Sequence, residues 1–88
     1  MLWGAGRNGK DLARLLLERE RTIVWVCDNP KKIGRDVYGV VMKSCRTITE
    51  RGRPQIVVAV ASDTEKAKIR SQLASWGKEP RDDFWFFL

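Results

Sequence analysis

Three glycines near the start of the chain stand at the spacing of a phosphate-binding loop. The stretch GAGRNG places Gly4, Gly6 and Gly9 in the pattern G-x-G-x-x-G. Between a strand and a helix, the first glycine allows a tight turn, the second lets the backbone approach a phosphate, and the third lets the helix pack close to the sheet. The helix that follows offers N–H groups to an anion, and Arg7 and Asn8 stand at its start. The spacing therefore indicates a nucleotide site.

An acidic residue lies at the distance that such a site requires. Asp28 comes 19 residues after Gly9, at the end of an apolar segment. A carboxylate at the end of a second strand is suited to hydrogen-bond a ribose hydroxyl. The alternative is that Asp28 only caps the turn after it and that the glycines serve only strand–helix packing. The candidate nucleotide-binding residues are Gly4, Gly6, Arg7, Asn8, Gly9 and Asp28.

The remaining residue types exclude several kinds of catalysis. The chain has no histidine, which removes Ser-His-Asp and Cys-His chemistry and the commonest zinc ligand. Cys27 and Cys45 do not make a disulfide framework, and the apolar surroundings of Cys27 favour a buried thiol in a reducing, cytoplasmic compartment. Asp82 and Asp83 are adjacent rather than spaced as D-x-D, which favours a polar turn over a metal site. We expect no catalytic residue and no metal ligand.

Apolar patterns divide the chain into four strands and two helices that position these residues. Near-continuous apolar runs predict buried strands, and apolar residues at i, i+4 spacing predict helices with one core-facing side. Ser62 and Glu65 fit a capping box at the start of the second helix, and Gly77 suits the position after its end. The predicted elements are a strand stub at 1–3, a helix at 8–19, strands at 22–28 and 54–62, a helix at 62–77 and a strand at 83–87.

The segment between the second and third strands, residues 29–54, is less regular. Its sequence predicts a short helical turn at 30–33 that Gly34 ends, and one short strand at 37–42 with a bend or bulge at Gly39. A structureless segment of this length is unusual in a small domain, so we expect these fragments to pack against the rest.

The order of elements predicts an α/β fold. Two β-α-β units joined by an irregular link indicate one Rossmann-like domain over residues 1–88, with a parallel sheet of about four strands and helices packed on it. We expect the strand order 2-1-3-4 and right-handed crossovers. This order places a crevice at the carboxyl ends of the first and third strands, beside the glycine loop.

The composition fits a soluble domain with an excess of positive charge. No apolar run is long enough for a membrane span, and no signal peptide is recognised. The net charge of +6 favours a polyanionic partner such as RNA or a phosphate-bearing ligand, although a solvated surface with a chance excess explains it equally simply. If RNA binds, the expected strand order brings five cations to one basic rim: Arg7, Lys10, Lys31, Lys32 and Arg35.

Four stretches together resemble a known group of proteins: LWGAGRNGKDLARLL, VWVCDNPKKIG, PQIVVAVAS and DFWFF. They look like the C-terminal Rossmann-like domain of family 2 glycosyltransferases of the β-1,3-N-acetylglucosaminyltransferase-like group, which includes the queuosine-tRNA galactosyltransferase. The likeness covers essentially the whole chain. A similar small fold also caps some sugar C-methyltransferases and the amino end of sugar acetyltransferases.

This resemblance implies an accessory role in sugar transfer. In that group, catalysis lies in an N-terminal glycosyltransferase domain, where a D-x-D motif binds a metal and a nucleotide sugar. No D-x-D occurs here, so no catalytic residue carries over. The chain would then be a C-terminal portion of a longer protein, with the N-terminal domain and tRNA as expected partners, and the isolated chain would be inactive.

Two other functions stay open at this stage. One is a stand-alone module that binds a nucleotide or a nucleotide sugar through the glycine loop. The other is a fragment of an NAD-dependent oxidoreductase, which is less favoured because no second domain brings a substrate to the nicotinamide.

Overall fold

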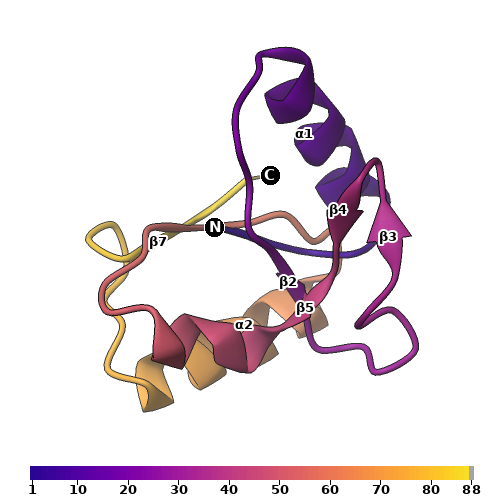
Figure 1. Ribbon diagram of the computed structural model, residues 1–88. Coiled ribbons are helices and arrows are strands. Elements are labelled where there is room, and N and C mark those ends of the chain that lie inside the picture. The colour runs from indigo at the N-terminus through magenta and orange to yellow at the C-terminus, as the bar shows by residue number, and fades with distance from the viewer. Residues whose placement is uncertain (88) are drawn as a thin grey trace.

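A five-stranded parallel sheet forms the centre of the protein, and helices cover both of its faces (Figure 1). The computed structural model describes residues 1–87. The spatial order of the strands is β5-β2-β1-β6-β7. Their bounds are β1 Leu2–Trp3, β2 Trp25–Cys27, β5 Lys43–Ser44, β6 Ile56–Val58 and β7 Phe84–Phe86.

The predicted α/β fold and the predicted strand order are confirmed. The predicted order 2-1-3-4 corresponds to β2-β1-β6-β7, and all the pairings in the sheet are parallel. The sequence missed β5, which adds a fifth strand beside β2. The strands are also shorter than predicted, because the hydrogen-bonded part of each apolar run ends before the run does. Of the predicted strand at 22–28, for example, only Trp25–Cys27 forms β2.

The alternation of side chains along the strands separates two hydrophobic clusters. On one face, Trp3, Val26 and Val58 pack with side chains from α2 (Asp63–Ser75) and from the 3-10 helix η1 (Cys45–Glu50). On the other face, Leu2 and Trp25 pack with Leu12 and Ala13 of α1 (Arg7–Glu18). This arrangement fixes both long helices to the sheet and places their N-termini at its carboxyl edge.

Residues 36–41 form a β-hairpin, where the sequence predicted one bent strand. Strands β3 (Asp36–Val37) and β4 (Val40–Val41) pair antiparallel and lie outside the main sheet. Tyr38 and Gly39 between them have φ angles of 55° and 82°, and two consecutive left-handed residues reverse the chain in a tight hairpin turn. The Asp36 carboxylate supports the turn by accepting a hydrogen bond of 2.9 Å from the Gly39 N–H.

Helix α2 begins and ends at the residues that the sequence predicted as its caps. Helix α2 begins after Ser62, whose hydroxyl accepts a hydrogen bond of 3.3 Å from the Glu65 N–H, as the capping box predicted. It ends before Gly77, which has a φ of 75°. Within the described residues, neither helix combines the length and the apolar character that crossing a membrane requires.

Candidate nucleotide-binding site

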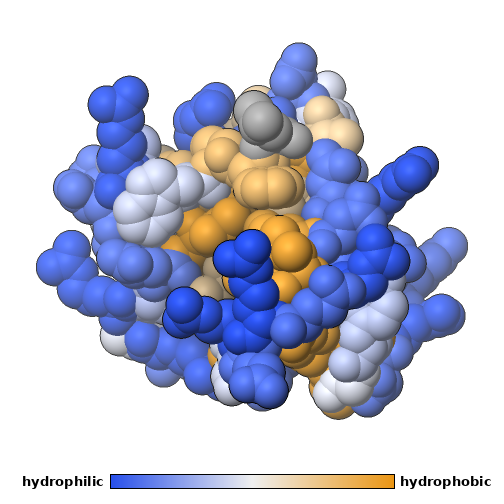
Figure 2. Space-filling model, turned by 90° about the horizontal axis from the view of Figure 1, so that it is seen from above, coloured by the Kyte–Doolittle hydropathy of each residue, from blue (hydrophilic) through white to orange (hydrophobic). Residues whose placement is uncertain are grey.

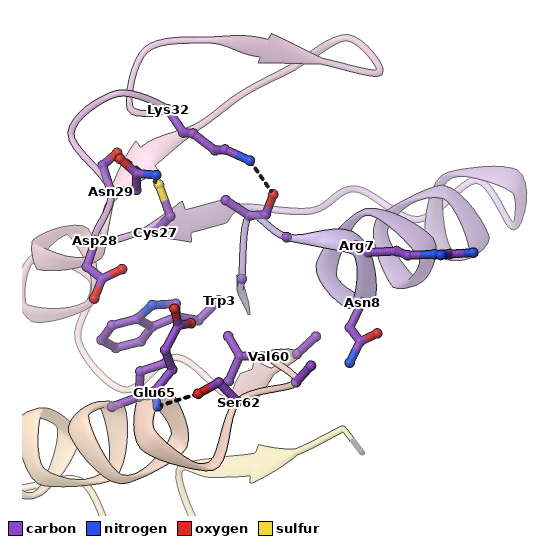
Figure 3. A pocket seen from close by; sticks show the side chains of 16 residues that line it. Trp3, Arg7, Asn8, Cys27, Asp28, Asn29, Lys32, Val60, Ser62 and Glu65 are labelled. Carbon is purple, nitrogen blue, oxygen red and sulfur yellow. Dashed lines mark hydrogen bonds between the residues drawn. The ribbon is translucent and has the colours of Figure 1, made fainter.

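The carboxyl edge of β1, β2 and β6 surrounds a cavity of about 340 Å³ (Figure 3). One wall is the glycine loop and the start of α1, the second is the segment that follows β2, and the third is the segment from β6 into α2. This is the crevice that the expected strand order placed beside the glycine loop, and parallel α/β sheets bind their ligands at such an edge. The lining residues from these three walls include Gly6, Asn8, Asp28, Lys32, Ser62 and Glu65.

Two of the three loop glycines are required by the packing of the backbone. A Cβ on Gly4, which has a φ of 147°, would overlap the carbonyl group of Ala59 in the neighbouring segment. A Cβ on Gly9 would overlap the carbonyl group of Gly4, because α1 begins directly against the end of β1. The Gly4 carbonyl also accepts a hydrogen bond of 2.6 Å from the buried indole Nε1 of Trp25. Gly4 and Gly9 therefore hold the loop and the helix in place.

Gly6 stands apart from the other two glycines. Its φ of −82° suits any residue, and a Cβ built on it meets no atom within 4 Å. Gly6 lines the cavity, so the space that a side chain would occupy is open. The packing of this chain gives no reason for glycine at this position, whereas the close approach of a ligand does.

The N-terminus of α1 carries no counter-charge of its own. Gly6 is the N-cap residue and supplies no side-chain hydrogen bond, and the first turn contains no acidic residue. The partial positive charge at the start of α1 therefore faces the cavity, and no carboxylate in the first turn of α1 neutralises it. Backbone N–H groups at such an end form a site for a phosphate.

Asp28 and Lys32 occupy the opposite wall, on the segment that follows β2. Asp28 lines the cavity and is exposed, so its carboxylate is available to hydroxyl groups of a ligand. Lys32 reaches across the cavity, and its Nζ donates a hydrogen bond of 3.1 Å to the carbonyl oxygen of Ala5 in the glycine loop (Figure 3). The turn that carries Lys32 is supported by the Asn29 side chain, whose Oδ1 accepts a hydrogen bond of 3.0 Å from the Lys31 N–H.

The Cys27 thiol belongs to the floor of the site but is not prepared for chemistry. It is buried and contacts the carbonyl oxygen of Asn29 at 3.7 Å. Burial raises the pKa of the Cys27 thiol above its ordinary value, so the thiol stays protonated at neutral pH. Among the described residues, no three His, Cys, Asp or Glu side chains gather in a way that would hold a metal ion.

The structure brings most of the predicted site residues together. Five of the six line the cavity: Gly4, Gly6, Arg7, Asn8 and Asp28. Gly9 lies behind them, against Gly4. The Arg7 side chain extends along α1, away from Asp28 and Trp3 (Figure 3), so its contribution to the cavity comes from the backbone. That these residues bind a nucleotide stays a prediction.

Sequence reasoning missed the third wall of the cavity. Val60, Ser62 and Glu65 come from the chain between β6 and α2, and Trp3 contributes from the end of β1. The capping box located Ser62 and Glu65 at a helix start, and the strand order put that start at the same edge as the glycine loop. Combining these two predictions would have placed both residues in the site.

Two of the five cations of the predicted basic rim belong to the residues that line the cavity. Arg7 and Lys32 line the cavity, whereas Lys10, Lys31 and Arg35 do not. Binding of RNA through these residues stays a prediction.

Comparison with known proteins identifies a shared fold. No protein-family model matches the chain, and no curated protein matches it in sequence. The crystal structure of RSP in complex with beta-NADH is similar, with a TM-score of 0.66 and 18% identity over 99% of this chain and 44% of that chain. The crystal structure of RSP, a Rex-family repressor, is similar with a TM-score of 0.69 and 18% identity over 99% of this chain and 43% of that chain. The chain thus has a Rossmann-like fold and spans less than half the length of those proteins.

The resemblance to glycosyltransferases is wrong. Solved structures that share the fold of the whole chain include those of RSP, a Rex-family repressor, and neither of these two is a glycosyltransferase. The sequence stretches that suggested sugar transfer are those that any small Rossmann-like domain requires, namely a glycine loop, a buried strand ending in an acid, and apolar strands. The accessory role in sugar transfer and in tRNA modification loses its basis with this correction.

Proposed function

We propose that this chain is a dinucleotide-binding module that takes a ligand of the NAD(H) class. The diphosphate lies against the backbone of Gly6, Arg7 and Asn8 at the start of α1. The Asp28 carboxylate accepts hydrogen bonds from the hydroxyl groups of the adenosine ribose. The proposal concerns binding and assigns no reaction to the chain.

One observation carries the proposal. Helix α1 begins at a glycine with open space in front of it, has no acid in its first turn, and faces a cavity that also contains an acidic residue at the end of β2. An anion and a ribose together satisfy all of these features. The complex of the structurally similar RSP with beta-NADH supports this choice of ligand class.

The replacement Gly6→Ala tests the proposal with little risk to folding. The new methyl group meets no protein atom within 4 Å, so we expect the melting temperature to stay unchanged. The same methyl group would occupy the space that the diphosphate needs, and we expect NADH affinity to fall at least about tenfold, which corresponds to about 1.4 kcal/mol. Isothermal titration with NADH measures the affinity of both proteins.

Asp11 is exposed and does not line the cavity, so the replacement Asp11→Glu is the matched control and should bind NADH like the wild type. If Gly6→Ala binds NADH as tightly as the wild type, or if the wild type shows no amide shifts around Gly6 at about 1 mM NADH, the ligand class is wrong.

A second measurement tests the role given to Asp28. A carboxylate beside the ribose repels a 2′-phosphate, so the wild type should bind NADH more tightly than NADPH. The replacement Asp28→Asn removes the repulsion and should narrow that preference by about fivefold. An unchanged ratio of the two affinities would place the ribose elsewhere.

A further inference from the structure

Among residues 1–87, no helix lies over the half of the sheet formed by β6 and β7 on the side of α1. The register pairs Leu2 with Val57 and Val57 with Trp85, so these three side chains project from the same face of β1, β6 and β7. Leu2 lies in the cluster that α1 covers, whereas Trp85 is 37% exposed and Phe87 is 44% exposed. Figure 2 shows this face as an apolar hollow surrounded by hydrophilic side chains. We call it the open face.

Helix α1 forms one wall of the open face. Leu12 and Leu15 lie at i and i+3 of the helix, and its C-cap residue Arg19 follows at i+7, so the three make one stripe along it. Leu12 is buried, while Leu15 is 45% exposed. A groove of about 390 Å³ lies at the foot of this wall, lined by Leu16 and Arg19 from α1 and by Val57 from the sheet. The open face therefore has an apolar floor and an apolar side wall.

The charges around this groove have one sign. Among the described residues that line it, the charged side chains are those of Arg19 and Arg21. Glu18 and Glu20, the acidic residues nearest in sequence, do not line it. The occupant of the groove is thus expected to carry acidic residues beside its apolar ones.

The shape of the open face suits a helix. Parallel sheets are normally covered on both faces, and the layer that covers them consists of helices lying side by side at about 8–10 Å. α1 already forms half of such a layer. A second helix beside it would contact Leu15 with one flank and Val57 and Trp85 with its underside.

We infer that the open face is a docking site for an amphipathic helix with acidic flanks, supplied by a partner segment. The apolar side of that helix covers Val57, Trp85 and Phe87, and its acidic flank pairs with Arg19 and Arg21. A second copy of this chain is a poorer occupant, because it brings the same pair of arginines and a net charge of +6. The inference does not depend on the nucleotide site, which lies at the other end of α1.

Two synthetic peptides test the inference on the full chain. Both are about 18 residues long, a length that supports helix formation, and both carry leucine at i, i+3, i+4 and i+7. One has glutamate on its flanks and the other has lysine. We expect the glutamate peptide to bind about fivefold or more tightly than the lysine peptide, and we expect added salt to reduce the difference. Fluorescence anisotropy gives the affinities, and amide shifts locate the peptide.

Variants separate the two components of the docking site. Arg19→Glu with Arg21→Glu should reverse the preference between the two peptides, and both residues are exposed, so the fold should be kept. Trp85→Ser with Phe87→Ser should remove binding of either peptide. The control pair Tyr38→Ser with Val41→Ser removes exposed large apolar side chains from the hairpin instead and should leave the binding of both peptides unchanged.

Three outcomes would overturn the inference. Equal affinity for the two peptides, also after the double arginine replacement, would show that charge does not select the occupant. Amide shifts confined to other surfaces would show that the open face is not the docking site. A dimer in sedimentation that Trp85→Ser with Phe87→Ser dissociates would show that a second copy covers the face instead.

Discussion

The two long helices begin at the same edge of the sheet, on different walls of one cavity, yet their first turns differ in chemistry. α2 is capped by the Ser62 hydroxyl and carries Asp63 and Glu65 in its first turn. α1 begins at Gly6 with neither a side-chain cap nor an acid. The partial positive charge at the start of α2 is therefore countered by side chains of that helix. The first turn of α1 supplies no such side chain. This difference is the reason why the proposed diphosphate site is assigned to α1 and not to α2.

The largest effect is expected from Gly9→Ala, which tests how α1 is held against the loop. The new Cβ would overlap the Gly4 carbonyl group, so the helix must move away from the end of β1. We expect a loss of about 3 kcal/mol or more in the free energy of unfolding. Urea denaturation measures it, with the exposed replacement Glu18→Ala as the control. If Gly9→Ala lowered the free energy of unfolding no more than Glu18→Ala does, α1 would be able to move away from β1 without loss of stability.

The replacement Gly6→Asp turns the start of α1 into one like that of α2. An aspartate at the N-cap accepts a backbone N–H and counters the helix dipole, so stability should rise by about 0.5 kcal/mol. The same carboxylate would occupy the place of the diphosphate, and NADH affinity should fall about 30-fold, or about 2 kcal/mol. Thermal melting and titration of one preparation measure both quantities. If Gly6→Asp raised both the stability and the NADH affinity, or lowered both, the proposed difference between the starts of α1 and α2 would be contradicted.

The reverse change removes the cap of α2. Ser62→Ala leaves the Glu65 N–H without its acceptor, and the free energy of unfolding should fall by about 1 kcal/mol. NADH affinity should stay within about twofold, because the ligand uses the other helix. Ser62→Thr keeps the hydroxyl and serves as the control. A large loss of affinity in Ser62→Ala alone would move the anion to α2.

The smallest effect is expected at Glu65, whose carboxylate lines the cavity on the side of α2. Its negative charge acts through solvent on a bound diphosphate, so Glu65→Gln should raise NADH affinity by about twofold at low salt and by less at high salt. Titrations at two ionic strengths measure this. A loss of affinity would show that Glu65 holds the ligand by hydrogen bonds rather than repelling it.

The sequence was most informative where local chemistry decides the structure. The glycine spacing, the acid after β2 and the capping box at Ser62 are all read from short stretches, and the structure gathers them at one edge. The sheet order followed from rules on parallel connections and needed no contact information. The motif also gave the three glycines different roles, and the coordinates show that a Cβ on Gly4 or Gly9 would overlap the backbone whereas a Cβ on Gly6 would not.

Prediction failed where distant contacts or backbone angles decide the structure. Strand β5 has only two residues, Lys43 and Ser44, and lies at the edge of the sheet, so its sequence carries no apolar pattern. The hairpin depends on a left-handed φ at Tyr38, a residue that gives no turn signal. The expected strand order placed Lys32 at the carboxyl edge of the sheet, but its hydrogen bond to the Ala5 carbonyl oxygen in the glycine loop is a distant contact that no spacing rule shows.

The central position of β1 determines how this chain folds. Leu2 pairs with Trp25 on one side and with Val57 on the other, so the middle of the sheet joins residues that lie far apart in the sequence. Closing the longer of these two loops has the higher entropic cost, and folds with many such distant pairings cross their barrier slowly. We therefore expect pairing of β1 with β2 to precede pairing with β6, and the arrival of β6 to set the folding rate. Weakening β6 should then slow folding, whereas weakening the edge strand β7 should mainly speed unfolding.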